Sequence, residues 1–558
     1  MEDLVGSFDA FTGTSQRLLF RDETLGDPGA LPECPEGDVP RTQIYGACSI
    51  ESYRAAGALH AAHRDAGGFL DQVDCYVMPD FWRRDGAVKS WIYATDAREV
   101  SSGRNMDAVR VFYHAGHGRV DENGVFHLPM GALWSGADAC LSSEQMTLGR
   151  QNLRYLFWST SESLCLSERM DPMHVWARAN AGLRMMFGFG SVCWDSGKYG
   201  ANFWRHWRMG KSLSQSWLDG AWDVAPDQIP VVSACGANRH EAIETLFGER
   251  RFSEQRARGD WWAWRWHAPL AAHQRGTAPF EAPAELQAAR LVPVAADMDL
   301  AERVLAALDV DPALCLRDGE GRIAVRLGDT RFLRRVDGHI LLELQAGGPG
   351  RGGRTSLRLQ RRSIVNRARN ALRRFGFVSP GSELIFDRMT LAMSASSNLY
   401  MLGEHALETV DEIIVQFRQA IGGVPVLTSG AGTLKVVLCP DGDLLRIEST
   451  LRQVAELMPA RGDRNGHPAD PLPPAGTEPA AAAATDADQM LALHSARLMR
   501  DLAARGAAPL NLRVLPDTSE IGYGIRSNTA RLVARKGIEI ECVRGFRKRY
   551  WMQSDLGD

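Results

Sequence analysis

The chain has 558 residues, of which 45% are hydrophobic and 24% are charged, and its formal net charge is −4. This length predicts two to four domains. The slight negative charge argues against a nucleic-acid partner. No run of about 18 apolar residues occurs, so we expect no transmembrane helix and no membrane partner. The acidic start, Met1–Asp9, lacks the pattern of a signal peptide, which favours a cytoplasmic protein, with secretion as the alternative if such a peptide was removed. The ten cysteines form no Cys-x-x-Cys pair, which argues against a zinc ribbon or a disulfide scaffold.

Residues 1–40 are rich in Gly, Pro and acidic residues and predict an irregular N-terminal arm. Residues 41–240 alternate short apolar runs with helical patterns, which predicts an α/β domain with a mainly parallel sheet flanked by helices. The expected strands are 44–48, 73–78, 108–117, 153–161, the segment around Phe187 and the segment from Pro230. The expected helices are 50–63, with Ser49 as N-cap, and 212–222.

The remaining chain predicts smaller α+β domains. We expect a Trp-rich connector at 241–289, a small α+β module at 290–345, a Gly/Arg linker with a basic helix at 346–380, a second α+β module at 381–457, a Pro/Ala-rich linker at 458–488, and a C-terminal helix with strands at 489–558. In the 381–457 module, three strands joined by Gly-rich and Pro-Asp-Gly turns predict an antiparallel meander. The basic helix at 361–375 favours a solvated face over a nucleic-acid site. The chain ends in a basic-aromatic tail, Arg544–Trp551.

Reactive residues follow two of the expected parallel strands. One strand ends in His117-Gly118, and the next ends in Ser161. Ligands bind at the carboxyl ends of the strands in an open parallel sheet. A histidine and a nucleophile-type residue at two such ends predict covalent acyl transfer.

Residues 40–240 resemble the caspase-hemoglobinase peptidases, a group that includes caspases, gingipains, legumain and separase. The resemblance rests on the two strands ending at His117-Gly118 and Ser161, and on the segments Trp176, 185–190, 200–204 and 210–222. It implies a caspase-like cysteine endopeptidase that needs no cofactor and acts on a peptide or protein substrate. It also implies that His117 is the general base, and that the N–H groups of Gly118 and Ser161 hold the oxyanion. The 381–457 module looks like the PepSY-like modules of peptidase propeptides, and 290–345 looks like a second copy.

Ser161 stands where the resemblance would place the nucleophilic cysteine. It could be a working nucleophile, it could be an inactivating substitution of natural or engineered origin, or Cys165 could be the thiol that matters. Because a serine needs a stronger base than a thiol, we expect a cysteine-peptidase framework without its nucleophile. A non-catalytic peptide-binding protein and a peptide ligase or cyclase on the same fold are the alternatives.

Each candidate residue also has a structural interpretation. His117 could cap a strand, Ser161 could be a helix N-cap, and Cys165 could be a buried structural thiol one turn into the next helix. Asp195 and Lys198 follow the Phe187 strand and predict a substrate pocket, with an ordinary polar loop as the alternative. His114 and His117 could bind zinc with His127 or Cys140, but their spacing fits no helix signature, so we expect no metal.

Overall fold

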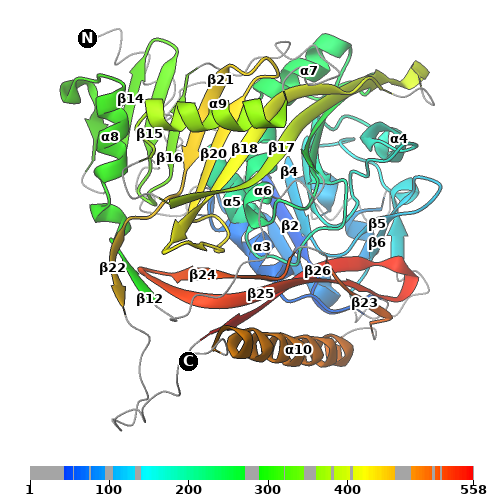
Figure 1. Cartoon of the computed structure of the whole chain (residues 1–558). Coiled ribbons are helices and arrows are strands. Elements are labelled where there is room, and N and C mark those ends of the chain that lie inside the picture. The colour runs from blue at the N-terminus through cyan, green and yellow to red at the C-terminus, as the bar shows by residue number, and fades with distance from the viewer. Residues whose placement is uncertain are drawn as a thin grey trace.

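The computed structural model describes residues 43–53, 56–74, 77–94, 105–131, 140–270, 288–318, 321–344, 360–378, 383–401, 406–458, 479–505, 509–515 and 518–556. Within these residues the fold is a mixed α/β structure built on one 16-stranded open sheet (Figure 1). The predicted N-terminal arm at 1–40 and most of the two predicted linkers lie outside the described residues.

One end of this sheet is parallel and carries the two strands on which the sequence analysis depends. In spatial order its strands are β3 (Phe81–Arg84), β2 (Tyr45–Ser49), β4 (Val111–Ala115), β8 (Tyr155–Ser159) and β9 (Met185–Phe189). The next strand, β10 (Pro230–Gly236), runs antiparallel to β9. The chain places β3 on one side of β2 and β4, β8 and β9 on the other, so the strand order reverses beside β2. Open α/β sheets bind ligands at such positions.

The sheet continues beyond β10 as an antiparallel extension, so its parallel part is smaller than predicted. The extension comprises β11 (Trp261–Pro269), β17 (Glu383–Asn398), β18 (Thr409–Ile421), β20 (Thr433–Leu438), β21 (Leu444–Ser449), β16 (Ile340–Glu343), β15 (Thr330–Arg334), β14 (Ile323–Leu327) and β13 (Leu316–Arg317), with β19 (Val424–Pro425) paired to β18. The Trp-rich segment, expected as a connector, forms strand β11 between β10 and β17, because its alternating aromatic side chains suit a pleated, half-buried surface. Strand pairing therefore crosses the predicted boundaries at 241 and 381.

Two smaller sheets complete the strands. The C-terminal sheet contains β22 (Val454–Met458), β12 (Ala288–Leu291), β25 (Thr529–Glu541) and β23 (Asn511–Val514), with β24 (Glu520–Arg526) and β26 (Arg547–Asp555) also paired to β25. A three-stranded sheet contains β5 (Arg119–Val120), β6 (Phe126–Pro129) and β7 (Cys140–Ser142). In Figure 1 the C-terminal sheet runs beneath the parallel strands, with α10 (Pro479–Arg505) on its outer side.

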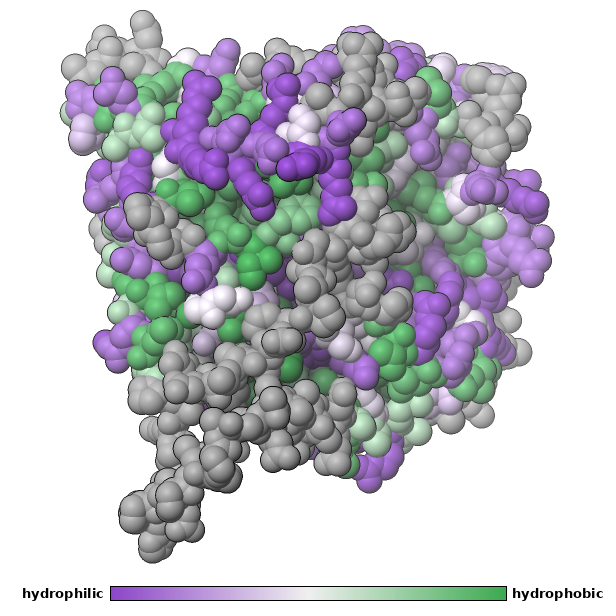
Figure 2. All heavy atoms as spheres, viewed as in Figure 1, coloured by the Kyte–Doolittle hydropathy of each residue, from purple (hydrophilic) through white to green (hydrophobic). Residues whose placement is uncertain are grey.

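The helices cover the sheet with apolar faces. They are α3 (Ala62–Leu70), α4 (Pro172–Trp176), α5 (Tyr199–Trp207), α6 (Leu213–Val224), α7 (Arg239–Gly248), α8 (Asp299–Ala307) and α9 (Arg361–Arg374). Helix α9 buries Ile364, Ala368 and Leu372 against β18, β20 and β21. Figure 2 shows hydrophilic side chains gathered along this helix, as expected for a solvated basic face. In the described part of the chain, no helix is long and apolar enough to cross a membrane.

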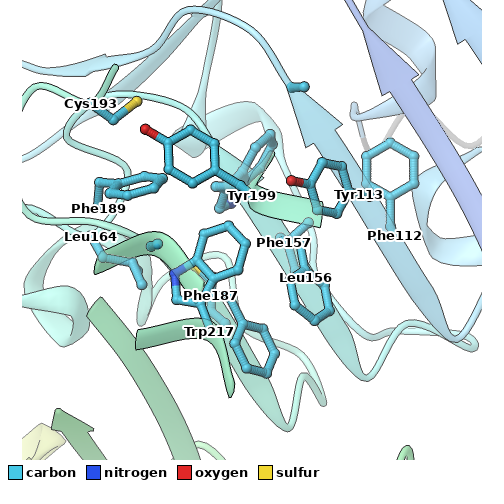
Figure 3. Packing of buried hydrophobic residues seen from close by; sticks show 14 of the residues in the cluster. Phe112, Tyr113, Leu156, Phe157, Leu164, Phe187, Phe189, Cys193, Tyr199 and Trp217 are labelled. Carbon is cyan, nitrogen blue, oxygen red and sulfur yellow. The ribbon is translucent and has the colours of Figure 1, made fainter. Parts of the chain in front are cut away.

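The core beneath the parallel strands is aromatic. Phe157 of β8 and Phe187 of β9 stack with ring centroids 4.1 Å apart, and Trp217 of α6 meets both rings edge-on. Figure 3 shows this packing, with Cys193 and Tyr199 at one end of it. Strands that are buried on both faces need such continuous apolar runs, which is why the sequence predicted these strands well.

Most predicted elements are confirmed near their expected positions, and α6 begins at the predicted cap, where the Ser212 hydroxyl accepts a hydrogen bond from the Gln215 N–H. Two predictions upstream are wrong. In place of the expected helix at 50–63, the described residues 50–53 and 56–61 form a loop, and α3 begins only at Ala62. The Ser49 hydroxyl contacts His63 Nδ1 at 2.8 Å instead of capping a helix. The expected strand at 73–78 is wrong because the Val73 N–H bonds the Leu70 carbonyl in the turn that ends α3.

Candidate functional site

The carboxyl ends of β4, β8 and β9 meet at one buried edge of the sheet. His117 follows β4 and Ser161 follows β8, and each is 1% exposed. Cys193 follows β9 and is fully buried, with its Sγ 3.6 Å from the Ser161 Oγ. The structure thus places a histidine, a hydroxyl and a thiol on three neighbouring strand ends.

His117 is held in one orientation by two hydrogen bonds. Its backbone N–H donates to the Tyr53 hydroxyl at 2.9 Å, and its Nε2 lies 2.9 Å from the Gly57 carbonyl oxygen. Because a carbonyl oxygen can only accept, Nε2 carries the proton and Nδ1 has the basic lone pair. Burial, with a contribution from the nearby Lys548 charge, lowers the pKa of His117 to about 3. The imidazole is therefore neutral at pH 7, and a carbonyl fixes its tautomer.

Several buried polar atoms at this edge have no hydrogen-bond partner among the described residues. They are His117 Nδ1, His114 Nε2, Trp158 Nε1 and Thr160 Oγ1. Each such group costs about 1–3 kcal/mol of stability, so native proteins keep few of them. All four lie in or directly after the adjacent strands β4 and β8, so this part of the sheet, like several others in the described chain, gives up stability.

The backbone is also constrained here. A Cβ at Gly116 would lie 2.6 Å from the Tyr53 hydroxyl oxygen and 2.8 Å from His114 Nε2, and one at Gly118 would lie 2.6 Å from the Phe126 ring. Glu162, directly after Ser161, has a φ of 58°, which is left-handed and strained for a residue with a side chain. Strain of this kind concentrates at functional sites.

The Ser161 hydroxyl is fully engaged. It donates to the Arg547 carbonyl oxygen at 3.0 Å and accepts the Cys193 N–H at 3.2 Å. Among the described residues no histidine or carboxylate bonds it, so nothing in this arrangement withdraws its proton. The interpretation of Ser161 as a helix N-cap is wrong, because a turn follows it instead of a helix. The oxyanion role of the Gly118 and Ser161 N–H groups stays a prediction.

Cys193 and Lys548 are the site residues that sequence reasoning missed. Lys548, in β26, places its Nζ 3.1 Å from the Cys193 Sγ and 3.2 Å from the Gly116 carbonyl oxygen. Cys193 had a signal in the sequence, since it follows a buried strand and small residues as Ser161 does. The sequence signal for Lys548 was weaker, because nothing in the basic-aromatic tail shows where that tail packs.

The other predicted residues are placed differently. Cys165 lies in a turn region, where burial and the nearby Glu162 charge raise the pKa of its thiol to about 11, and the predicted helix around it is absent. Asp195 lies at the site edge, where its carboxylate accepts the His60 N–H at 2.7 Å and burial raises its pKa. Lys198 is exposed at the start of α5, and its charged neighbours include Arg205 and Asp223, away from His117.

The set of His114 and His117 with His127 or Cys140, which its spacing already disfavoured as a zinc site, does not come together among the described residues. His114 Nδ1 bonds the Tyr93 hydroxyl, His117 bonds Gly57, and His127 pairs with Asp121. Among the described residues, the one group of possible metal ligands is His206, Asp219 and Glu448. The Lys211 ammonium lies within 2.9 Å of all three side chains, so it takes the place that a cation would need.

Residues 47–266 match the model of a family described as a domain of unknown function, DUF6345. The match is to less than half of the chain, and it begins in β2 and ends in β11. It includes His117, Ser161 and Cys193 but not Lys548. No curated protein and no solved structure gives a significant match.

Proposed function

We propose that this protein is a caspase-like cysteine endopeptidase in which Ser161 stands at the usual thiol position and Cys193, from the next strand end, supplies the thiol. The observation that carries the proposal is the state of His117, which is neutral and oriented by a carbonyl, with an unpartnered Nδ1. It follows β4, and the ends of the next two strands, β8 and β9, hold Ser161 and Cys193. A base oriented by a third group beside a nucleophile is the general arrangement of covalent catalysis.

The chemistry follows from these groups. The Cys193 thiol gives its proton to His117 Nδ1 as its sulfur forms a bond to the peptide carbonyl carbon. The same proton passes from His117 to the leaving amine as the C–N bond breaks. Water then hydrolyses the thioester, which restores the thiol and releases the acid. A thiol suits this site better than a serine, because His117 has no carboxylate partner among the described residues.

A second function is favoured by a separate observation. The backbone of β26 lies on Ser161 and Cys193, so the same edge binds an extended chain without any reaction. A non-catalytic peptide-binding protein on the same fold would keep the cradle and need no nucleophile.

One set of variants separates the two. Five proteins are incubated with a complex peptide library, and new termini are read by mass spectrometry. They are the natural chain, Cys193→Ser, Ser161→Cys, the double variant Ser161→Cys/Cys193→Ser, and His117→Gln. Each is tested with and without Arg547→Ala/Trp551→Ala, which weakens the seating of β26. We expect the natural thiol to cleave in the weakened background, Cys193→Ser and His117→Gln to lose at least about 100-fold, and the control Cys165→Ser to keep its activity.

The same data can contradict the proposal. Cleavage that survives Cys193→Ser would remove Cys193 as the nucleophile. Cleavage only after Ser161→Cys would make the natural chain a non-catalytic protein. If no form cleaves, the peptide-binding function takes precedence.

A further inference from the structure

The strand β26 makes the backbone contacts of a bound peptide at the candidate site. The Arg549 N–H donates to the Cys193 carbonyl at 3.2 Å, and the Asp195 N–H donates to the Arg549 carbonyl at 2.8 Å. The two segments form a parallel bridge at Trp194 and Arg549. Adding an extended strand to an exposed edge in this way is a common mode of peptide recognition. Here the added strand belongs to the chain itself.

The side chains of β26 meet complementary groups in turn. Arg547 pairs with Glu162. Arg549 lies 3.5 Å from an Asp227 carboxylate oxygen and also pairs, at 3.0 Å, with Glu539 of the adjacent strand β25. Trp551 stacks on Trp194, with ring centroids 4.2 Å apart and planes 9° apart. Arg547, Arg549 and Trp551 stand at every second position, so they share one face of the strand. Glu162, Asp227 and the Trp194 ring lie against this face.

The opposite face of β26 points inward. Phe546, Lys548 and Tyr550 are buried, and the Phe546 ring packs 6.1 Å from the His117 ring. Lys548 is 3% exposed, yet no carboxylate oxygen lies within salt-bridge distance of its Nζ among the described residues. Its described partners are a carbonyl oxygen and a thiol. The Asp195 and Asp65 carboxyls feel its charge only from beyond contact distance. A buried ammonium that no carboxylate contacts costs stability, so packing alone does not account for it.

We propose that Glu162, the segment Cys193–Asp195 and Asp227 form a binding cradle for an extended basic-aromatic peptide, and that Arg547–Trp551 fills this cradle as an internal ligand. The proposal takes its location from the proposed function, but binding requires no cleavage. A peptide in trans must displace the internal segment, so the intact chain binds such peptides weakly.

The test uses the full chain with Cys193→Ser, which separates binding from any turnover. The probe is a fluorescent peptide with the sequence of residues 544–552, and anisotropy gives its Kd. The loosened chain carries Arg547→Ala/Trp551→Ala, and the matched control carries Arg513→Ala/Arg526→Ala, two exposed arginines of the same sheet in β23 and β24. We expect the loosened chain to bind the probe at least about 10-fold more tightly than the natural and control chains.

Probe variants then test the chemistry. We expect three changes to weaken binding at least about 10-fold each. Two are in the probe, Lys548→Glu and a scrambled sequence of equal composition. The third is Glu162→Gln/Asp227→Asn in the loosened chain. Equal affinity for the natural and loosened chains, or equal affinity for the scrambled probe, would overturn the proposal. Binding without cleavage by the Cys193-containing chain would contradict the proposed function and leave this inference standing.

Discussion

Two buried lysines, Lys211 and Lys548, differ in the groups that surround their charge. Lys211, beside α6, has its Nζ 2.7 Å from Asp219 and 2.7 Å from Glu448, and it also contacts His206. Lys548 meets only a thiol and a carbonyl oxygen among the described residues. The Lys211 charge, in contact with two carboxylates, holds α6 to the antiparallel strands. The Lys548 ammonium contacts no carboxylate oxygen among the described residues and acts on Asp195 and Asp65 only from a distance. The comparison teaches that two equally buried lysines can differ in whether a carboxylate contacts them, and that this contact sets how much stability each one supplies.

The largest expected loss of folding stability follows a substitution at Lys211. Lys211→Met would leave the buried Asp219 carboxylate without its ammonium partner, and would leave Glu448 with its remaining ion pair, to Arg446 at 3.1 Å. The Lys211 charge helps to hold the pKa of both carboxyls well below the usual range. Breaking such a buried pair costs about 3–5 kcal/mol. Chemical denaturation against the natural chain measures the loss. A loss below about 1 kcal/mol would mean that the cluster is not the structural lock described here.

The next largest loss of stability is expected for Gly116→Ala. The new Cβ would lie 2.6 Å from the Tyr53 hydroxyl oxygen, so we expect a loss of about 1–3 kcal/mol from overpacking. Adding Tyr53→Phe removes that oxygen and should restore part of the stability. Thermal melts of the two single variants and the double variant measure the coupling, and strictly additive losses would show that the two groups do not meet.

The buried histidines make stability depend on pH. Burial lowers the pKa of His117 and His206 to about 3, whereas an unfolded histidine titrates near pH 6.5. Between these values the unfolded state binds more protons, so stability falls as the pH is lowered from about 6.5 towards 3.

His117→Gln should remove one of these protons and flatten the dependence by about 1.4 kcal/mol per pH unit. The control is His240→Gln, since the His240 side chain is 76% exposed. Unfolding free energies measured from pH 4 to 7 supply the slopes. An unchanged slope in His117→Gln would show that His117 is not buried and neutral.

The smallest change is expected at Lys548, and its sign is opposite to that at Lys211. Lys548→Met replaces a buried ammonium that contacts no carboxylate oxygen among the described residues with an apolar chain of similar length. The protein should therefore keep its stability or gain up to about 1 kcal/mol. The same denaturation experiment applies. A loss near that of Lys211→Met would make the two lysines equivalent and remove the contrast.

The sequence predicted the parallel end of the fold because its signal is local. Continuous apolar runs fix β4, β8 and β9, and a strand end is where reactive side chains collect, so His117 and Ser161 could be found. The antiparallel extension could not be read in the same way, since pairing between β11 and β17 joins segments far apart in the chain. Lys548 was hidden for the same reason, because it reaches Cys193 across 355 residues.

Covalent labelling tests the central claim most directly. The chain with Arg547→Ala/Trp551→Ala is treated with a lysine- and arginine-containing peptide that carries a thiol-reactive acyloxymethyl ketone, and the adduct is located by mass spectrometry. The account predicts an adduct on Cys193 that is lost in His117→Gln and unchanged in Cys165→Ser. An adduct on Cys165 with Cys193 unmodified, or no adduct on any cysteine of the folded chain, would contradict it.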